Sequence, residues 1–357
     1  MKKLVIDRDA IKNNLNIIKT RARGVEIIGD LSADAFGMGI VETARILRNE
    51  GVKSFAVSDP RDAERLRNLG FTDERLMMLR STADSDEIRD LIELGVICTV
   101  GSYDAAVAIN GIAEERKTVC EVQIKIDSGL GRYGFLPTET DKIASIFRYM
   151  PNLAVTGIFS TYSQSANSER ITRQEYETFK GVLEKLTQMG FEVGYTHIAD
   201  SAALFKYDFG TMDAVRVGTA LAGRVAGGAV PGLMRVGYIE AGVEEVGWFP
   251  KKHRIGGQKL RKPARLAVLS VGFFNGFGVN RVDYERSFWD LLRSRKRKPT
   301  VRLAGKKMKI VGEIGLLHTV IDVTDTECSV GDTCFLDVDP VNVKGLSRTY
   351  ISHEVEE

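Results

Sequence analysis

Lys125 and Arg132 lie in a glycine-rich segment, Lys125–Gly134, at the end of the apolar run Cys120–Asp127. An arginine held at a strand end offers a planar fork that matches a carboxylate, and a neighbouring lysine adds positive charge. This pair of cations can therefore bind an anionic group of a substrate. A glycine-rich turn with a surface ion pair explains the same residues equally well.

A second candidate segment, Thr196–Ala203, follows another apolar run and contains His197 and Ser201. A serine that opens a helix caps its N-terminus, and helix N-termini attract phosphate groups. The segment therefore offers a phosphate contact at Ser201. An ordinary helix cap is the simpler explanation when this serine is considered alone.

A third candidate segment, Val215–Gly223, contains Arg216, Gly218 and Thr219. A glycine lets backbone amides approach a phosphate closely, and the arginine supplies a cation beside it. The three segments together favour an anion site, and no cluster of ligand-type residues predicts a metal site.

These residues are positioned by eight apolar runs that alternate with helical patterns between Asp7 and about Gly228. Parallel strands that alternate with helices need right-handed crossovers, and eight such units close into a (β/α)₈ barrel. An open, doubly wound sheet is the alternative. The eight runs are Val25–Ser32, Ser54–Asp59, Arg75–Arg80, Ile97–Ser102, Cys120–Asp127, Ala154–Thr161, Tyr195–Ser201 and Asp213–Gly218.

The second part of the chain, residues 229–357, loses helical periodicity and is rich in short β-type stretches separated by turns. We expect an α/β barrel over residues 1–228, followed by an all-β domain with which the first residues of the chain pair. An insertion at about 282–298 ends in a basic run. It is interpreted as a charged, solvated surface rather than a patch for an acidic partner.

Composition excludes several classes of protein. The 357 residues have a formal net charge of +2, so no strong field points to nucleic acid or a membrane. No apolar run is long enough to span a bilayer, and the charged N-terminus does not resemble a signal peptide. The four cysteines show no paired spacing. We therefore expect a cytoplasmic protein with reduced thiols.

The segment Gly29–Gly39 lies where the first apolar run passes into a helical pattern. It closely resembles the cofactor-lysine motif of alanine racemases, Lys-Ala-Asp-Ala-Tyr-Gly-His-Gly. Ser32 stands where that motif has its lysine. The segments around Lys125, His197 and Arg216 resemble three further motifs of the same family. The chain is thus identified as a divergent member of the alanine racemase family of pyridoxal-phosphate fold type III proteins.

The resemblance implies roles for the candidate residues. Arg132 would lie beside the cofactor and the substrate carboxylate, and Lys125 would match a lysine that is carbamylated in some members. Ser201 would contact the cofactor phosphate with Gly218 and Thr219. His197 would lie near the pyridine ring, and Arg216 would face its nitrogen and keep it unprotonated, which suits racemisation. The family also implies a head-to-tail homodimer with each site at the interface.

The chain departs from the family at the residues that do the chemistry. Racemisation needs an imine with the cofactor and two bases on opposite faces of the substrate. Ser32 cannot form an imine, and Phe273 replaces the tyrosine that acts as the second base. At the substrate entrance Leu317 belongs to the altered segment Gly315-Leu316-Leu317. Glu313 replaces an arginine and is expected to pair with Arg216.

These losses favour a protein without racemase activity that keeps a pocket for a small anion, amino acid or phosphate compound, in a binding or regulatory role. Pyridoxal phosphate would bind at most noncovalently, and the protein could act without it. Two alternatives remain. One is an isomerase of the racemase or epimerase class with an altered mechanism or substrate. The other is a partner subunit of an intact racemase.

Overall fold

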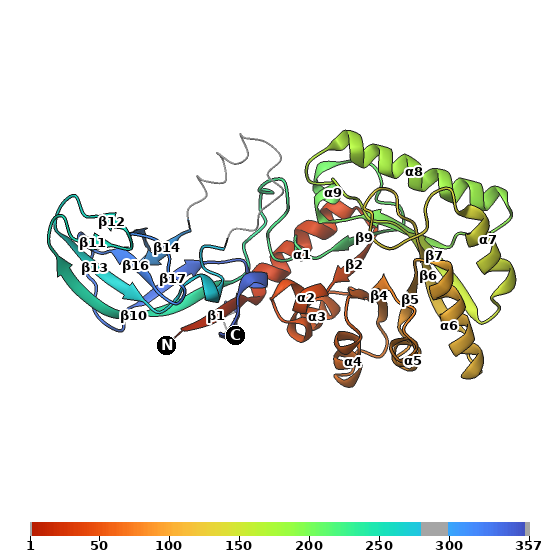
Figure 1. The fold of residues 1–357 in the computed structure, drawn as a ribbon, viewed down its shortest axis with the longest axis horizontal. Helices are drawn as coiled ribbons and strands as arrows, with labels where there is room; N and C mark the ends of the chain where they lie inside the picture. The colour runs from red at the N-terminus through yellow and green to blue at the C-terminus, as the bar shows by residue number, and fades with distance from the viewer. Residues whose placement is uncertain (1, 280–298, 354–357) are drawn as a thin grey trace. The chain divides into compact units, whose positions relative to one another are not determined.

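The computed structural model describes residues 2–279 and 299–353 (Figure 1). These residues form two compact units, one of residues 10–234 and the other combining the described parts of 1–9 and 235–357. The predicted insertion at about 282–298, its basic run included, lies outside the described residues.

The first unit is a closed barrel of eight parallel strands, so the predicted fold class is confirmed and the open-sheet alternative is wrong. Each strand pairs with the next along the chain, and the last, β9, pairs with the first, β2. The strands are β2 (Glu26–Asp30), β3 (Ser54–Val57), β4 (Arg75–Ser81), β5 (Ile97–Val100), β6 (Cys120–Lys125), β7 (Leu153–Phe159), β8 (Tyr195–Ala199) and β9 (Ala214–Val217).

Helices follow the strands and cover the outside of the barrel (Figure 1). Several begin where a serine or aspartate side chain accepts a backbone N–H of the first turn, as Ser102 does from Ala105. The helices are α1 (Arg8–Ala22), α2 (Ser32–Phe36), α3 (Ile40–Asn49), α4 (Pro60–Asn68), α5 (Ser85–Glu93), α6 (Tyr103–Glu115), α7 (Thr140–Tyr149), α8 (Glu169–Gln188) and α9 (Ser201–Lys206).

The barrel strands are buried on both faces because helices cover one face and the barrel interior the other. All four residues of β3, of β5 and of β9 are buried. Inside the barrel, Ile28, Ala56 and Ala214 form one apolar cluster, and Met77, Ile97 and Phe159 form another. Residues two positions further along a strand point to the same interior, one layer closer to its carboxyl end.

The second unit is mostly antiparallel and is built around the long strand β10, which pairs with β1, β13 and β17. The strands are β1 (Lys2–Asp7), β10 (Tyr238–Phe249), β11 (Arg254–Ile255), β12 (Gln258–Lys259), β13 (Ala264–Leu269), β14 (Val301–Leu303), β15 (Lys306–Ile310), β16 (Thr319–Asp322), β17 (Thr333–Asp337) and β18 (Ser347–Ile351). Two 3₁₀ turns, Phe273–Asn275 and Pro340–Asn342, complete the unit.

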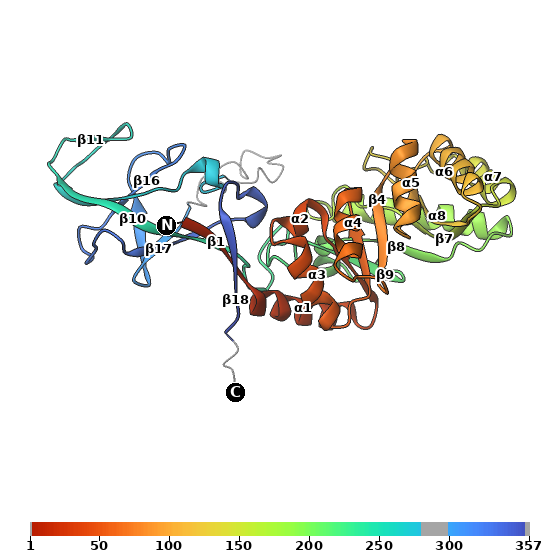
Figure 2. The same cartoon turned by 90° about the horizontal axis from the view of Figure 1, so that it is seen from below.

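The first and last strands of the chain lie side by side in this unit. Figure 2 shows β1 in red beside β18 in blue, and the two are parallel, with Leu4 opposite Arg348. On its other edge β1 pairs antiparallel with β10. The first strand therefore belongs to the β unit, although α1, which follows it directly, lies almost wholly in the barrel unit.

Candidate functional site

A layer of polar side chains lies in the barrel interior near the carboxyl ends of the strands. Gln123 and Lys125 come from β6, His197 from β8 and Arg216 from β9, and all four are buried. His197 reaches Gln123 across the intervening strand β7, which places both side chains inside the barrel. This end of a parallel barrel is where enzymes of this architecture place their active sites.

Arg216 is a buried guanidinium with only part of its donors used. Its Nη2 donates to the Ser160 carbonyl oxygen at 2.7 Å and to Thr161 Oγ1 at 2.9 Å, and its Nη1 bonds to His197. A guanidinium has five N–H donors, so part of its capacity is left over. No carboxylate of the described residues forms an ion pair with it. Burial lowers the pKa of Arg216 to about 10, while Asp30 and Asp200 act in the opposite direction.

His197 is held neutral, in a single tautomer. A guanidinium can only donate, so Nδ1 of His197 accepts the bond from Arg216. The proton therefore lies on Nε2, which donates to Gln123 Oε1 at 2.8 Å. Burial, followed by the positive charge of Arg216, lowers the pKa of His197 well below 6.5. The ring also stacks on Phe159, with centroids 5.0 Å apart.

Lys125 lies on the same interior face as Gln123, and only 3% of its surface is exposed. Its Nζ donates to the carbonyl oxygen of Arg132 at 3.0 Å. Burial, reinforced by Arg216 and Arg132, lowers its pKa to about 8. The lysine therefore braces the turn after β6 and adds a second cation to the interior.

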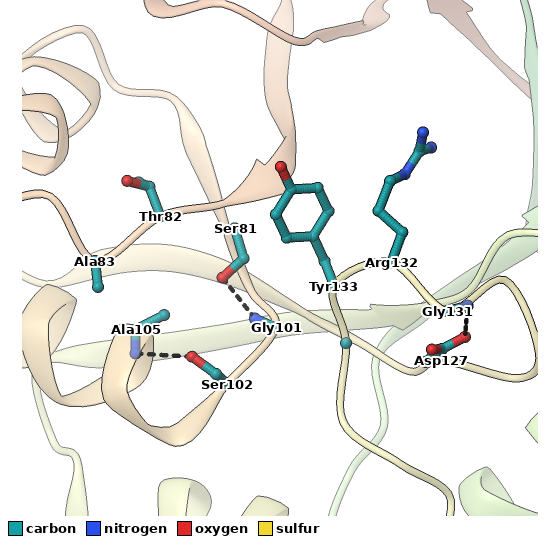
Figure 3. A pocket seen from close by; sticks show the side chains of 11 residues that line it. Ser81, Thr82, Ala83, Gly101, Ser102, Ala105, Asp127, Gly131, Arg132 and Tyr133 are labelled. Carbon is teal, nitrogen blue, oxygen red and sulfur yellow. Dashed lines mark hydrogen bonds between the residues drawn. The ribbon is translucent and has the colours of Figure 1, made fainter.

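The turn after β6 is organised by Asp127, whose Oδ1 accepts the backbone N–H groups of Gly129, Leu130 and Gly131. Arg132 follows on this turn and is exposed. The turn borders a pocket of about 330 Å³ over the ends of β4, β5 and β6 (Figure 3). Its lining residues are Ser81, Thr82, Ala83, Gly101, Ser102, Ala105, Asp127, Gly131, Arg132, Tyr133 and Gly134.

Ser201 lies at the first position of α9, and its buried Oγ accepts the backbone N–H groups of Gly218 and Ala220, each at 3.3 Å. The ring of Phe36 packs directly on Gly218, where an added Cβ would lie 2.1 Å from Phe36 Cε2. Two amides and a hydroxyl thus converge at the end of β9. Thr219, between these amides, is half-buried, and its carbonyl oxygen accepts the N–H of Arg224.

Ser32 follows β2, and its backbone N–H donates to Asp30 Oδ1 at 3.0 Å. Burial raises the pKa of Asp30, and the bonds from Ser32 oppose that rise. The next four residues, Ala33 to Phe36, have φ between 53° and 56°, which is left-handed backbone. Left-handed helical conformation costs an L-residue roughly 1–2 kcal/mol, so this turn stores strain. Asp34 Oδ1 supports it by accepting the N–H of Ile40 at 2.8 Å.

Phe273 and Leu317 lie in the β unit on two loops joined by backbone hydrogen bonds. The N–H of Phe273 donates to Gly315, and that of Phe274 to Leu316. Half of Phe273 is exposed, and Leu317 is 42% exposed. Glu313 belongs to the same unit, whereas Arg216 lies in the barrel, so the expected pair between them stays a prediction.

The structure thus brings Lys125, His197 and Arg216 together inside the barrel and places Ser201 with Gly218 at its carboxyl end. Sequence reasoning missed Gln123, Asp30 and Ser160. Gln123 stands two residues before Lys125 on one strand, which is a signal that both point inward. The roles of Asp30 and Ser160 depend on their interactions with Arg216, which is distant in the sequence, so no local pattern indicates them.

The described residues match only part of what pyridoxal phosphate would need. Arg216 can donate to a ring nitrogen, and the amides beside Ser201 can hold a phosphate. The hydroxyl of Ser32 cannot anchor the aldehyde. No group of three His, Cys, Asp or Glu side chains in residues 2–279 and 299–353 could hold a metal ion. In the same residues no helix is long and apolar enough to cross a bilayer.

Comparison with known proteins identifies the family. The profile "Alanine racemase, N-terminal domain" matches residues 6–225. The alanine racemase of Clostridium tetani is 30% identical over 342 residues, which cover 93% of this chain and 84% of that protein. That of Methylacidiphilum infernorum is 28% identical over 341 residues, covering 93% and 82%.

Solved structures show the same fold. An alanine racemase from Clostridium difficile superposes with a TM-score of 0.84 at 23% identity, over 99% of this chain and 96% of the other. The Bartonella henselae alanine racemase, solved with covalently bound pyridoxal phosphate, gives 0.81 at 22% identity, over 98% and 99%. Together with the sequence matches, this shows that the chain belongs to the alanine racemase family.

Proposed function

We propose that this protein binds a small anion that bears a carboxylate or phosphate at the carboxyl end of its barrel, in a binding or regulatory role. The observation that supports this most directly is the state of Arg216. Only 6% of its surface is exposed. Some of its N–H donors are unused, and it has no carboxylate partner among the described residues. A buried charge without a partner is strongly destabilising. A bound ligand with an acceptor atom would remove that cost.

The neighbouring groups indicate the class of ligand. The amides of Gly218 and Ala220 already converge on one oxygen, Ser201 Oγ, and suit a phosphate or carboxylate. Arg132 offers a second cation on the turn beside the pocket. The ligand is therefore proposed to be an amino acid or a small phosphate compound, with pyridoxal phosphate bound noncovalently if it binds at all.

The proposal excludes racemisation through an imine at position 32. Ser32 has a hydroxyl in place of the family lysine, and a hydroxyl forms no imine. Phe273 has no proton to exchange, so the second base is missing as well. The left-handed turn from Ala33 to Phe36 nevertheless persists, at a cost of roughly 1–2 kcal/mol per residue. Retained strain at this position supports a binding role for the turn.

The racemase test uses purified protein with pyridoxal phosphate and L-alanine, and chiral chromatography measures D-alanine. We expect no turnover above background. The double variant Ser32→Lys with Phe273→Tyr restores both missing groups, and we expect at most weak racemisation, because Phe36 and Leu317 still differ from the family. Robust turnover by the original protein would refute the proposal.

A homodimer with a head-to-tail arrangement is also proposed. Four large apolar side chains, Phe273, Phe274, Leu316 and Leu317, are 42–54% exposed on the two joined loops of the β unit. Burying such a patch against another subunit would remove apolar surface from water. The same patch supports the second candidate function, a partner subunit of an intact racemase. Co-expression with an intact racemase, followed by affinity purification of this chain, tests that candidate.

A cytoplasmic location fits this proposal, since the four cysteines are all buried free thiols. Fractionation of cells that express the tagged protein tests the location. Recovery in an oxidising compartment would contradict it.

A further inference from the structure

Lys125 is a buried amine whose surroundings do not neutralise it. Its Nζ has one hydrogen bond, to the Arg132 carbonyl oxygen, and lies 5.6 Å from the Tyr133 ring centroid and 5.9 Å from that of Phe159. Among the described residues no carboxylate forms an ion pair with it. Surface lysines differ, as Lys142 shows with its contact to Glu139 at 2.6 Å.

Two cations act on this amine from different elements. Arg216 on β9 stands over the same Phe159 ring, 5.4 Å from its centroid, and Arg132 lies on the turn after β6. Asp127, on that turn, is the acid that acts in the opposite direction. With its pKa lowered to about 8, about a tenth of Lys125 is uncharged at pH 7 and has a free electron pair, far more than for an ordinary lysine. Desolvation and a neighbouring cation are the two ways in which proteins make lysine a nucleophile.

Two neighbours of this buried amine line a pocket, of which Lys125 itself is not a lining residue. Tyr133 and Arg132 both border the pocket of about 330 Å³, and both contact Lys125, one through its ring and the other through its carbonyl oxygen. In Figure 3 the side chains of Arg132 and Tyr133 extend in the same direction from the turn. A small molecule with an anionic group would be attracted by the Arg132 guanidinium and held close to the buried amine.

We propose that Lys125 is a nucleophilic site that captures a small carbonyl compound bearing a carboxylate, such as an α-oxo acid, as a reversible imine. The electron pair of the neutral Nζ adds to the carbonyl carbon to give a carbinolamine. The carbinolamine oxygen then leaves as water, taking both amine protons, and a carbon–nitrogen double bond forms. No electrons are exchanged, so the step needs no oxidant or reductant. The site rests on the proposed anion pocket and gives it a covalent chemistry.

The experiment treats the intact protein with glyoxylate and sodium cyanoborohydride and maps the modified peptides by mass spectrometry. Reduction turns the imine into a stable carboxymethyl group. A lysine with a pKa of about 8 has on the order of a hundredfold more free amine near pH 7 than one at 10.5. We therefore expect Lys125 to be labelled at least tenfold faster than any exposed lysine, with a rate that rises up to about pH 8.

Three variants test the parts of the site. Lys142→Gln removes an exposed lysine and should leave the labelling of Lys125 unchanged. Arg132→Gln should slow labelling by glyoxylate at least fivefold and labelling by propionaldehyde, which has no charge, by much less. Lys125→Gln should abolish the fast phase. The labelling rate of Lys125 in the original protein decides the test by itself, so the test still holds if Lys125→Gln fails to fold.

The inference is overturned if Lys125 reacts no faster than the exposed lysines. That is the result expected of a buried lysine that only braces the turn. Formation of a carbamate from ¹³C-bicarbonate on Lys125, without any trapped glyoxylate, overturns the inference equally. Calorimetric titration with pyridoxine phosphate, which has no aldehyde, separates the two proposals. Binding of that probe with an unreactive Lys125 refutes the imine and leaves the proposed function standing.

Discussion

Replacing Lys125 with methionine should stabilise the barrel at neutral pH and lose that advantage in alkali. The lowered pKa, about 8 against 10.5, means that burying the charged amine costs on the order of 3 kcal/mol when it is fully protonated. Methionine has a similar length and no charge, but it loses the hydrogen bond to the Arg132 carbonyl, worth about 1 kcal/mol. The net gain near pH 7 is therefore about 2 kcal/mol.

The sign of the pH dependence follows from proton binding. Between the folded pKa of about 8 and the unfolded value of 10.5, the unfolded chain binds more protons, so the original protein gains stability as the pH rises. The variant lacks this gain, and the difference between the two proteins should shrink and then change sign by about pH 10. Urea denaturation at several pH values, followed by circular dichroism, measures it. A variant that is less stable than the original protein near pH 7, by a margin that pH does not change, would contradict this prediction.

Three further predictions concern other parts of the molecule. Ala33→Gly should raise the free energy of unfolding by about 0.5–1 kcal/mol, because Ala33 has a φ of 54° that glycine adopts without strain. Ala108→Gly in helix α6 is the control and should lower it by about 1 kcal/mol. Urea denaturation measures both, and changes of the same sign would contradict this prediction. Burial holds the pKa of His197 well below 6.5, so below pH 6.5 the unfolded chain binds a proton that the folded chain does not. The free energy of unfolding should therefore fall by up to about 1.4 kcal/mol per pH unit, and by less in His197→Gln. Parallel plots of unfolding free energy against pH for the two proteins would exclude this. Phe273→Asp with Leu317→Asp should convert the proposed dimer into monomers by light scattering, and a dimer of unchanged mass would count against it.

The barrel could be predicted from the sequence because each strand is short, apolar and followed by a helical pattern. Such alternation leaves few topologies. The pairing of β1 with β10 and β18 joins residues from opposite ends of the chain, and the sequence predicts only that the first residues pair with the β unit. The strand registers and the division at Met234 and Arg235 depend on tertiary contacts that no local pattern specifies.

The candidate site could be predicted in its residues but not in its connections. Sequence motifs indicate Arg216, His197 and Lys125, whereas the hydrogen bonds from Arg216 to Ser160 and Thr161 join separate strands and loops. The left-handed turn could not be predicted, because Ala33 and Ala35 have a local preference for right-handed backbone. Tertiary structure overrides propensity there, as happens at functional sites.

Calorimetric titration with pyridoxine phosphate tests whether the barrel mouth binds an anionic ligand noncovalently without a lysine at position 32. The probe has the ring nitrogen and the phosphate but no aldehyde, so an imine cannot contribute. We predict saturable binding of one ligand per chain, weakened at least tenfold by Arg216→Met and by Ser201→Ala and unchanged by Lys142→Gln. Absence of binding, or binding that Arg216→Met and Ser201→Ala leave unaltered, would contradict an anion site at the barrel mouth.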